Sequence, residues 1–198
     1  TLIKKKFNPQ VLSGKQACRK ELVRMHSLKI KETTPILCMV SRFTKQKGIE
    51  LIMKSMDMIM KNDVALIILG AGEKTYHDFF VSQNYTGRFS YQNSFSEAAS
   101  HQIIAGSDII MVPSQYEPCG LTQIYGLKYG TVPLVRAVGG LDDTVKEFTP
   151  RTGKGNGFKF KPFEVKYFLA ALRKAVASFK NKLQWQSLML RGMSENHS

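Results

Sequence analysis

Two cations and one carboxylate are the residues of this sequence whose types and spacing best fit a chemical site. Arg42 and Lys47 stand in one short segment, Ser41 to Gly48, separated by four residues. An arginine fork and a lysine point charge in one loop can hold a diphosphate, although the residues alone equally allow two exposed surface cations. Glu117 stands further along the chain, where a carboxylate can accept hydrogen bonds from neutral hydroxyls such as those of a sugar.

The segment around Glu117 has the pattern of a loop that leads into a helix. Residues 121–129 fit a helix that ends at Gly130, so the amides just after Glu117 would lie at a helix N-terminus. Such amides suit an anion, and they belong to Gly120, Leu121 and Thr122. Alternatively, Glu117 stabilises the helix dipole, by about 0.3–1 kcal/mol. The sequence therefore predicts phosphate beside sugar hydroxyls at this loop.

Two further features are weaker candidates. Gly70 and Gly72 form a glycine loop between an apolar strand and a helix, which indicates either phosphate binding or a tight turn. Cys119 lies near a helix start, where thiols become reactive, but the local sequence offers it no His or Asp partner. For Cys119 we therefore expect small-residue packing beside a ligand rather than covalent chemistry.

Apolar runs and helical periodicity predict the elements that carry these residues. The expected strands are 36–40, 64–69, 88–91, 109–112, 132–135 and 157–160. The expected helices are 15–25, 49–60, 96–105, 121–129, 162–179 and 185–193. Strands alternating with helices predict an α/β fold with a doubly wound, Rossmann-like parallel sheet. Its ligand crevice should gather loops 41–48, 70–73, 94–96, 113–120 and 137–141.

Length and composition predict one domain. The chain has 198 residues and 43% hydrophobic content, enough for one sizeable core over 1–198. A basic lead-in covers 1–34, and C-terminal helices cover 162–198 and are expected to be cut short. The start lacks both a signal peptide and an initiator Met, so we expect a fragment without a targeting segment. An uninterrupted apolar run long enough for a membrane span is missing, and the three cysteines show no metal spacing.

The net charge of +14 is concentrated in residues 1–50 and 146–182, away from most of the expected ligand loops. One interpretation is a nucleic-acid or other anionic partner. The other is solvated helix faces in a lysine-rich protein, which we favour because no nucleic-acid-binding module is recognisable.

The stretch EPCGLTQIYGLKYGTVPLVRAVGGLDDTV, from Glu117 to Val145, resembles the signature of bacterial glycogen synthases and plant starch synthases. These are retaining glucosyltransferases of the two-domain GT-B type. The match is dense over this stretch, and a weaker similarity runs over nearly the whole chain. The resemblance covers only the second of the two domains, so it implies the C-terminal half of a GT-B enzyme.

The resemblance also implies roles for single residues. Arg42 and Lys47 match the positions associated with the nucleotide diphosphate, and Glu117 matches the glutamate that contacts the transferred sugar. Phe95 matches an aromatic position that stacks on the nucleobase. Tyr125 stands where related transferases have a second glutamate, and Val138 replaces the Thr of a TGGL turn. The first departure fits the glycogen synthase branch, and the second removes any contact made by that hydroxyl.

The implied reaction transfers glucose from ADP-glucose to the 4-hydroxyl at the non-reducing end of an α-1,4-glucan, with retention. No cofactor or metal is expected, because protein cations stabilise the leaving diphosphate. The implied partners are the glucan and an N-terminal domain in cis, without nucleic acid or membrane, in a bacterial cytoplasm or a plastid. Two alternatives stay open: a retaining transferase that uses another nucleotide sugar such as UDP-glucose, and a non-catalytic nucleotide- or glucan-binding fragment.

Overall fold

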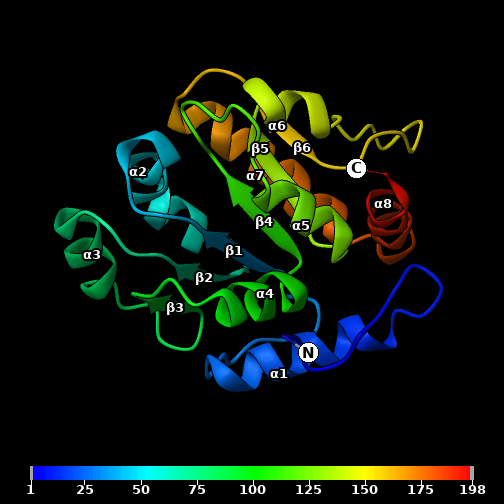
Figure 1. Cartoon of the computed structure of the whole chain (residues 1–198), viewed down its shortest axis with the longest axis horizontal. Coiled ribbons are helices and arrows are strands. Elements are labelled where there is room, and N and C mark those ends of the chain that lie inside the picture. The colour runs from blue at the N-terminus through cyan, green and yellow to red at the C-terminus, as the bar shows by residue number, and fades with distance from the viewer. Residues whose placement is uncertain (1, 197–198) are drawn as a thin grey trace.

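A single six-stranded sheet forms the centre of the molecule in the computed structural model, which describes residues 2–196 (Figure 1). The strands are β1 (Ile36–Val40), β2 (Ala65–Leu69), β3 (Phe89–Gln92), β4 (Ile109–Val112), β5 (Val132–Arg136) and β6 (Phe158–Phe160). Their order is β3-β2-β1-β4-β5-β6, and every neighbouring pair is parallel. This is a doubly wound Rossmann-like order, so the predicted fold class is confirmed.

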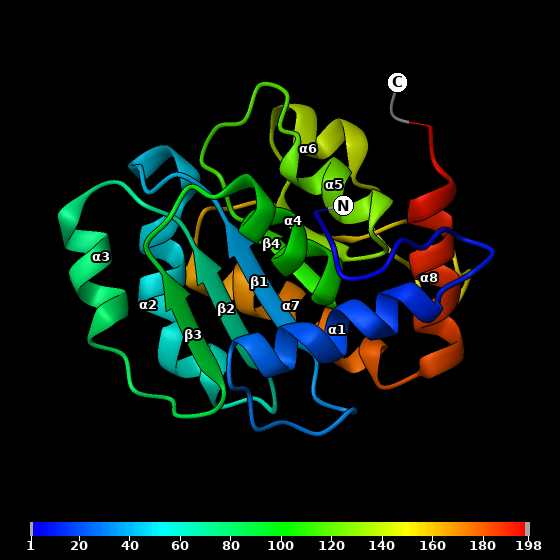
Figure 2. The ribbon, with the colours of Figure 1, turned by 60° about the horizontal axis from the view of Figure 1, so that its bottom comes forward.

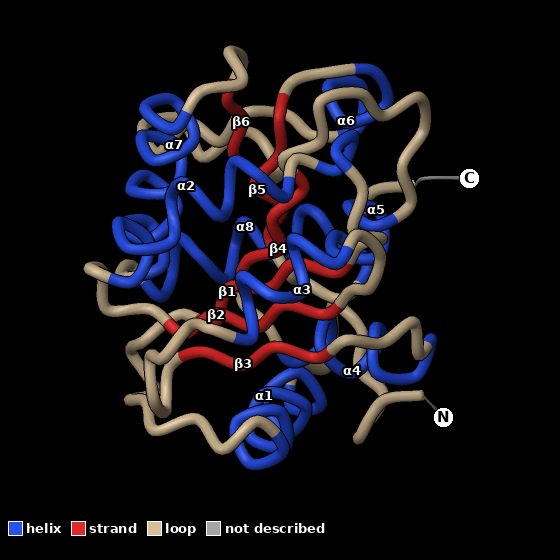
Figure 3. Tube along the Cα trace, turned by 90° about the vertical axis from the view of Figure 1, so that its left-hand side faces the viewer, coloured by secondary structure: helices blue, strands red, loops and turns tan. Residues whose placement is uncertain are grey.

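Helices cover both faces of the sheet. They are α1 (Ser13–Met25), α2 (Ile49–Met60), α3 (Lys74–Val81), α4 (Glu97–Gly106), α5 (Thr122–Lys128), α6 (Gly139–Thr144), α7 (Val165–Phe179) and α8 (Lys182–Ser194), with a short 3-10 helix η1 (Lys45–Lys47). Figure 2 shows α1 and α4 in front of the strands and α2 and α7 behind them. In Figure 3, α2 and α7 lie on one side of the strands and α5 and α6 on the other.

Alternation along β1 explains why this sheet is apolar on both faces. Leu37 and Met39 point into one core cluster, which they share with residues of α2 and α7. Ile36 and Cys38 point into the other, shared with residues of α1 and α4. Successive strand side chains face opposite sides, so a strand covered by helices on both sides needs an unbroken apolar run. That burial fixes the strand ends from which the ligand loops start.

Three predicted boundaries are wrong. Residues 139–144 form helix α6 where we expected only a loop. The helix expected from Pro162 begins at Val165, because Glu164 still has an extended backbone with φ −139° and ψ 144°. The Arg136 guanidinium lies over the ring of Phe163 in this extended segment, 5.6 Å from its centroid. The last helix begins at Lys182 rather than at residue 185, because the Asn181 side chain caps it by accepting from the Gln184 N–H at 3.1 Å. The end of that predicted region, residues 197–198, lies outside the described residues.

Candidate functional site

A cavity of about 220 Å³ opens at the carboxyl ends of β1 and β4, the two neighbouring strands at which the strand order reverses. Crevices of this kind at the switch point of an open α/β sheet are where such folds bind ligands. The first part of the lining comes from β1 and the loop after it: Met39, Val40, Ser41, Arg42 and Lys47. The second part comes from β4, its loop and the start of α5: Met111, Val112, Pro113, Ser114, Glu117, Gly120, Leu121, Thr122 and Gln123.

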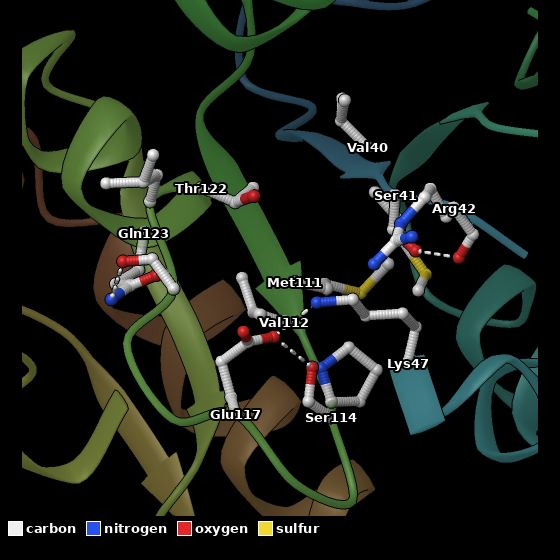
Figure 4. Close-up of a pocket in the computed structure, with 14 residues that line it drawn as sticks. Val40, Ser41, Arg42, Lys47, Met111, Val112, Ser114, Glu117, Thr122 and Gln123 are labelled. Carbon is white, nitrogen blue, oxygen red and sulfur yellow. Dashed lines mark hydrogen bonds and ion pairs between the residues drawn. The ribbon is translucent and has the colours of Figure 1, made fainter. Parts of the chain in front are cut away.

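Lys47 and Glu117 meet inside this cavity (Figure 4). Lys47 Nζ lies 2.5 Å from Glu117 Oε2, and only 20% and 10% of the two side chains are exposed. The Ser114 hydroxyl donates to the same Oε2 at 3.2 Å. Among the described residues, the other oxygen, Oε1, takes no hydrogen bond, although Glu117 lines the cavity. The carboxylate therefore has one occupied oxygen and one that is open to a ligand.

Arg42 lines the same cavity from the loop after β1 and is exposed. Its carbonyl accepts a hydrogen bond from the Ser41 hydroxyl at 2.6 Å, which shapes the turn at the strand end. Within residues 2–196, no carboxylate lies within ion-pair distance of its guanidinium. The structure thus brings together the predicted residues Arg42, Lys47 and Glu117, with one cation paired and the other unpaired.

The two loops that carry these residues are bonded directly to each other. The Gln115 N–H donates to the Gln46 carbonyl at 2.8 Å, and the Gln46 side-chain amide donates to the Tyr116 carbonyl at 3.0 Å. Arg136, at the end of β5, donates to the Gln115 carbonyl at 2.6 Å. Sequence reasoning missed Gln46 and Arg136, although Gln46 stands inside the motif beside Lys47. These bonds hold the two loops together and so fix the positions of Lys47 and Glu117 relative to each other.

Gly48 allows the two loops to approach so closely. It has φ +76°, and a Cβ at this position would lie 2.1 Å from the Pro113 carbonyl oxygen. Only glycine fits both the left-handed backbone and the missing space. Gly48 also joins the end of η1 to the start of α2, so it directs the chain from Lys47 into the helix.

Gly70 and Gly72 do not line the cavity; they pack against the loop that carries Arg42. A Cβ on Gly70 would lie 2.2 Å from the Ser41 carbonyl oxygen, and one on Gly72 would lie 2.2 Å from the Phe43 carbonyl oxygen. Phe43 is itself fully buried, and its N–H donates to the Ala71 carbonyl at 2.7 Å. The geometry fits the tight-turn interpretation, in which the missing side chains of the glycines let their backbone pack closely against the loop of Arg42. Their predicted contact with a nucleotide stays a prediction.

The turn after Glu117 contributes Gly120, Leu121 and Thr122 to the lining, as expected, whereas Cys119 is exposed and does not line the cavity. Sequence reasoning missed Gln123, which is fully buried. Its side-chain amide donates to the carbonyls of Cys119 and Gly120 at 3.2 and 3.0 Å and to the Thr144 hydroxyl at 3.2 Å. Gln123 therefore fixes the shape of the turn and ties it to α6.

Phe95 and Tyr125 lie outside the cavity lining. Phe95 is 63% exposed in the loop before α4, so its predicted role under a nucleobase stays a prediction. The Tyr125 ring contacts the His101 ring of α4, with 5.3 Å between centroids, instead of reaching the cavity. His101 also lies within hydrogen-bond distance of the Tyr129 hydroxyl, at 2.8 Å, so its contacts link α4 to α5 and the residue after it.

Residues 2–196 offer neither a metal-ligand cluster nor a membrane-spanning helix. This part of the chain contains no group of three or more His, Cys, Asp or Glu side chains that could hold a metal ion. Every helix described in it is too short or too polar to cross a membrane. The expectation that no metal is required stays a prediction.

The sequence is similar to those of curated glycogen synthases. The chain is 43% identical over 195 residues to a glycogen synthase of Koribacter versatilis, covering 98% of this chain and 40% of that protein. It is 40% identical over 198 residues to a glycogen synthase of Bacillus cereus, covering 99% of this chain and 42% of that protein. The chain thus spans about two fifths of the length of the curated relatives it matches.

Among solved structures, the catalytic domain of starch synthase IV from Arabidopsis thaliana, bound to ADP and acarbose, superposes on the whole chain with a TM-score of 0.92. The two sequences are 28% identical, and the match covers 42% of that protein. The parallel sheet and its flanking helices are those of a GT-B glycosyltransferase domain, as predicted. The sequence pattern of the family Glycosyl transferases group 1 matches residues 23–186. The chain therefore belongs to the group 1 glycosyl transferases.

Proposed function

We propose that this chain is the nucleotide-sugar-binding domain of a glycogen or starch synthase. The proposed reaction transfers glucose from ADP-glucose, with retention, to the non-reducing end of an α-1,4-glucan. The observation that carries the proposal is the Lys47–Glu117 pair inside the switch-point cavity, with Arg42 beside it. The matches to glycogen synthases and to the ADP-bound starch synthase IV support the choice of sugar and nucleotide.

Each group of the cavity has a proposed part in this reaction. Arg42 and Lys47 bind the diphosphate and stabilise the negative charge that grows on it as the glycosidic bond breaks. Glu117 accepts hydrogen bonds from hydroxyls of the transferred glucose through its open Oε1. The turn at Gly120, Leu121 and Thr122 lines the cavity and contacts the donor. Because these cations supply the electrostatic stabilisation, we propose that no metal or other cofactor takes part.

The whole enzyme needs partners that lie outside this chain. We propose a glucan acceptor and a second GT-B domain in cis, which would approach the cavity from the carboxyl edge of the sheet. This follows from the length of the relatives, of which the chain spans about two fifths. A bacterial cytoplasm or a plastid is the compartment that agrees with this function.

The test of the proposal compares ADP, ADP-glucose, UDP and UDP-glucose by titration calorimetry against the purified chain and Glu117→Gln. We expect the adenine nucleotides to bind more tightly than the uridine nucleotides. We also expect Glu117→Gln to weaken ADP-glucose at least tenfold more than ADP, because glucose is the only part that distinguishes these ligands. Equal losses for both ligands would make Glu117 a structural residue, and a preference for uridine would replace ADP-glucose with UDP-glucose as the donor.

A further inference from the structure

Ser114 is a fully buried serine at the end of β4, and its hydroxyl has one hydrogen-bond partner among the described residues. That partner is Glu117 Oε2, at 3.2 Å. Buried hydroxyls are normally retained for the hydrogen bond they make, since a buried polar group without a partner is destabilising. The Ser114 hydroxyl therefore acts on Glu117 and on no other described residue.

The two oxygens of Glu117 differ because of Ser114 and Lys47. Both neighbours contact Oε2, and neither contacts Oε1 (Figure 4). A carboxylate that met only the flexible lysine ammonium could turn about its terminal torsion and offer either oxygen to it. A hydroxyl anchored on the backbone is directional, so it fixes the carboxylate plane. With Oε2 held in this way, Oε1 is the oxygen of this cavity-lining carboxylate that stays free to accept a hydrogen bond from a ligand.

Ser114 is well placed for such a task because its backbone lies where the two loops of the site contact each other. It directly follows Pro113, whose carbonyl lies against Gly48 of the facing loop. Gln115, the next residue, donates to the Gln46 carbonyl. The short Ser114 side chain therefore keeps its hydroxyl close to a backbone that these contacts hold in place. The longer Glu117 side chain depends on its neighbours for its orientation.

We propose that Ser114 is a positioning residue for nucleotide-sugar recognition. It holds Oε2 of Glu117 so that Oε1 is presented to a hydroxyl of the transferred sugar. The inference rests on the function proposed above, because it takes Glu117 as the residue that contacts the sugar. It adds that the discrimination between a nucleoside diphosphate and its sugar derivative depends on the orientation that the Ser114 hydroxyl gives to the Glu117 carboxylate.

The experiment measures the dissociation constants of ADP and ADP-glucose by titration calorimetry for wild type, Ser114→Ala, Glu117→Gln and the double variant. Ser114→Ala removes one oxygen atom without adding volume, and thermal unfolding verifies that each variant is folded. We expect Ser114→Ala to weaken ADP-glucose about three- to tenfold and to leave ADP within about twofold. If Ser114 acts through Glu117, Ser114→Ala should have no further effect in the Glu117→Gln background.

Four outcomes would overturn the inference. Equal weakening of ADP and ADP-glucose by Ser114→Ala would indicate a structural role. Losses that multiply in the double variant would show that Ser114 acts independently of Glu117. A normal ligand ratio in Ser114→Ala, with an altered ratio in Glu117→Gln, would reject the role of Ser114 while the proposed function stands. If Glu117→Gln also leaves the ratio unchanged, the assignment of Glu117 to the sugar fails together with the inference.

Discussion

Lys47 enters ligand binding already paired, whereas Arg42 enters it without a carboxylate partner. Lys47 Nζ forms an ion pair with Glu117 Oε2 at 2.5 Å, whereas the Arg42 guanidinium lines the same cavity without a carboxylate partner among the described residues. An incoming diphosphate must therefore share Lys47 with an existing anion, but it meets Arg42 as a free cation. The two residues, which look equivalent in the sequence, should respond differently to substitution.

Arg42→Ala and Lys47→Ala should both weaken ADP binding, and Lys47→Ala should weaken it more. A charge-assisted bond to phosphate contributes about 1.5–3 kcal/mol, which corresponds to at least tenfold in affinity. Lys47→Ala additionally leaves the Glu117 carboxylate facing the phosphates without a neutralising partner. Titration calorimetry of ADP against both variants measures the losses.

The matched control for this prediction is Lys47→Ala combined with Glu117→Gln. If the uncompensated carboxylate causes the additional loss, the double variant should bind ADP more tightly than Lys47→Ala alone. Unchanged ADP affinity in both single variants would remove Arg42 and Lys47 from the phosphate site.

At the scale of elements, helix α1 is fixed to the sheet by a buried lysine. Lys15 is 5% exposed, and its ammonium donates to the Ser107 carbonyl at 2.7 Å and to the Thr131 hydroxyl at 2.6 Å. Burial lowers the pKa of Lys15 from 10.5 to about 8, although the nearby Asp108 carboxylate acts in the opposite direction. Ser107 and Thr131 precede β4 and β5, so this anchor lies at the edge of the sheet opposite the cavity.

The free energy of unfolding should therefore contain a contribution from Lys15 that rises with pH. Below about pH 8 both states hold the proton, and between about 8 and 10.5 only the unfolded state holds it. Loss of the proton from the folded state removes the penalty for the buried charge, so stability increases by on the order of 1 kcal/mol per pH unit in this window. Urea unfolding of wild type and Lys15→Met at several pH values gives the difference, in which tyrosine ionisation cancels. Parallel pH profiles for the two proteins would contradict the prediction.

Gly48→Ala should disrupt the contact between the loops after β1 and β4. The added methyl would lie 2.1 Å from the Pro113 carbonyl oxygen, and the backbone has φ +76°. Gly153→Ala is a matched control, because Gly153 has φ +65° and its nearest neighbouring atom would be 4.0 Å away. We expect about 1 kcal/mol of destabilisation for Gly153→Ala, from backbone strain alone, and about 3 kcal/mol or more for Gly48→Ala. Similar unfolding midpoints for the two variants would show that the loops can separate at little cost.

The strands and the central residues of the site could be predicted from the sequence, because buried strands are continuous apolar runs and their ends locate the loops. Helix α6 could not be predicted, because the local pattern of Gly139 and Gly140 is typical of a turn. The helix forms where the backbone of these glycines packs on the loop of Glu117. A Cβ at either position would lie 2.2 Å from a carbonyl oxygen of that loop. Such packing between distant segments leaves no local pattern, and the same is true of the bonds made by Gln46 and Gln123.

At the scale of the whole molecule, large apolar side chains are exposed beside the cavity. Leu121, which lines it, is 61% exposed, and Tyr116 in the same loop is 62% exposed. Large apolar side chains beside a ligand site usually contact something else in the working assembly. In a GT-B enzyme the active site lies between two domains, and this chain spans about two fifths of its curated relatives.

The purified chain should consequently bind ADP but fail to elongate glucan. In a two-domain enzyme, closure of the second domain over the donor would exclude water and complete the site. The purified chain alone does not supply that second domain. The measurement incubates the chain with labelled ADP-glucose and glycogen, with Glu117→Ala as the background. Incorporation above that background would show that this domain alone suffices for transfer.

The close contact at Gly48 also limits how this site can change during evolution. Its backbone lies against Pro113, and the neighbouring residues Gln46 and Gln115 exchange a hydrogen bond, so the two loops share one surface although they are distant in sequence. A larger residue or an inserted residue in either loop would force the other to move. Substitutions in segments 41–48 and 113–117 should therefore be correlated among related sequences.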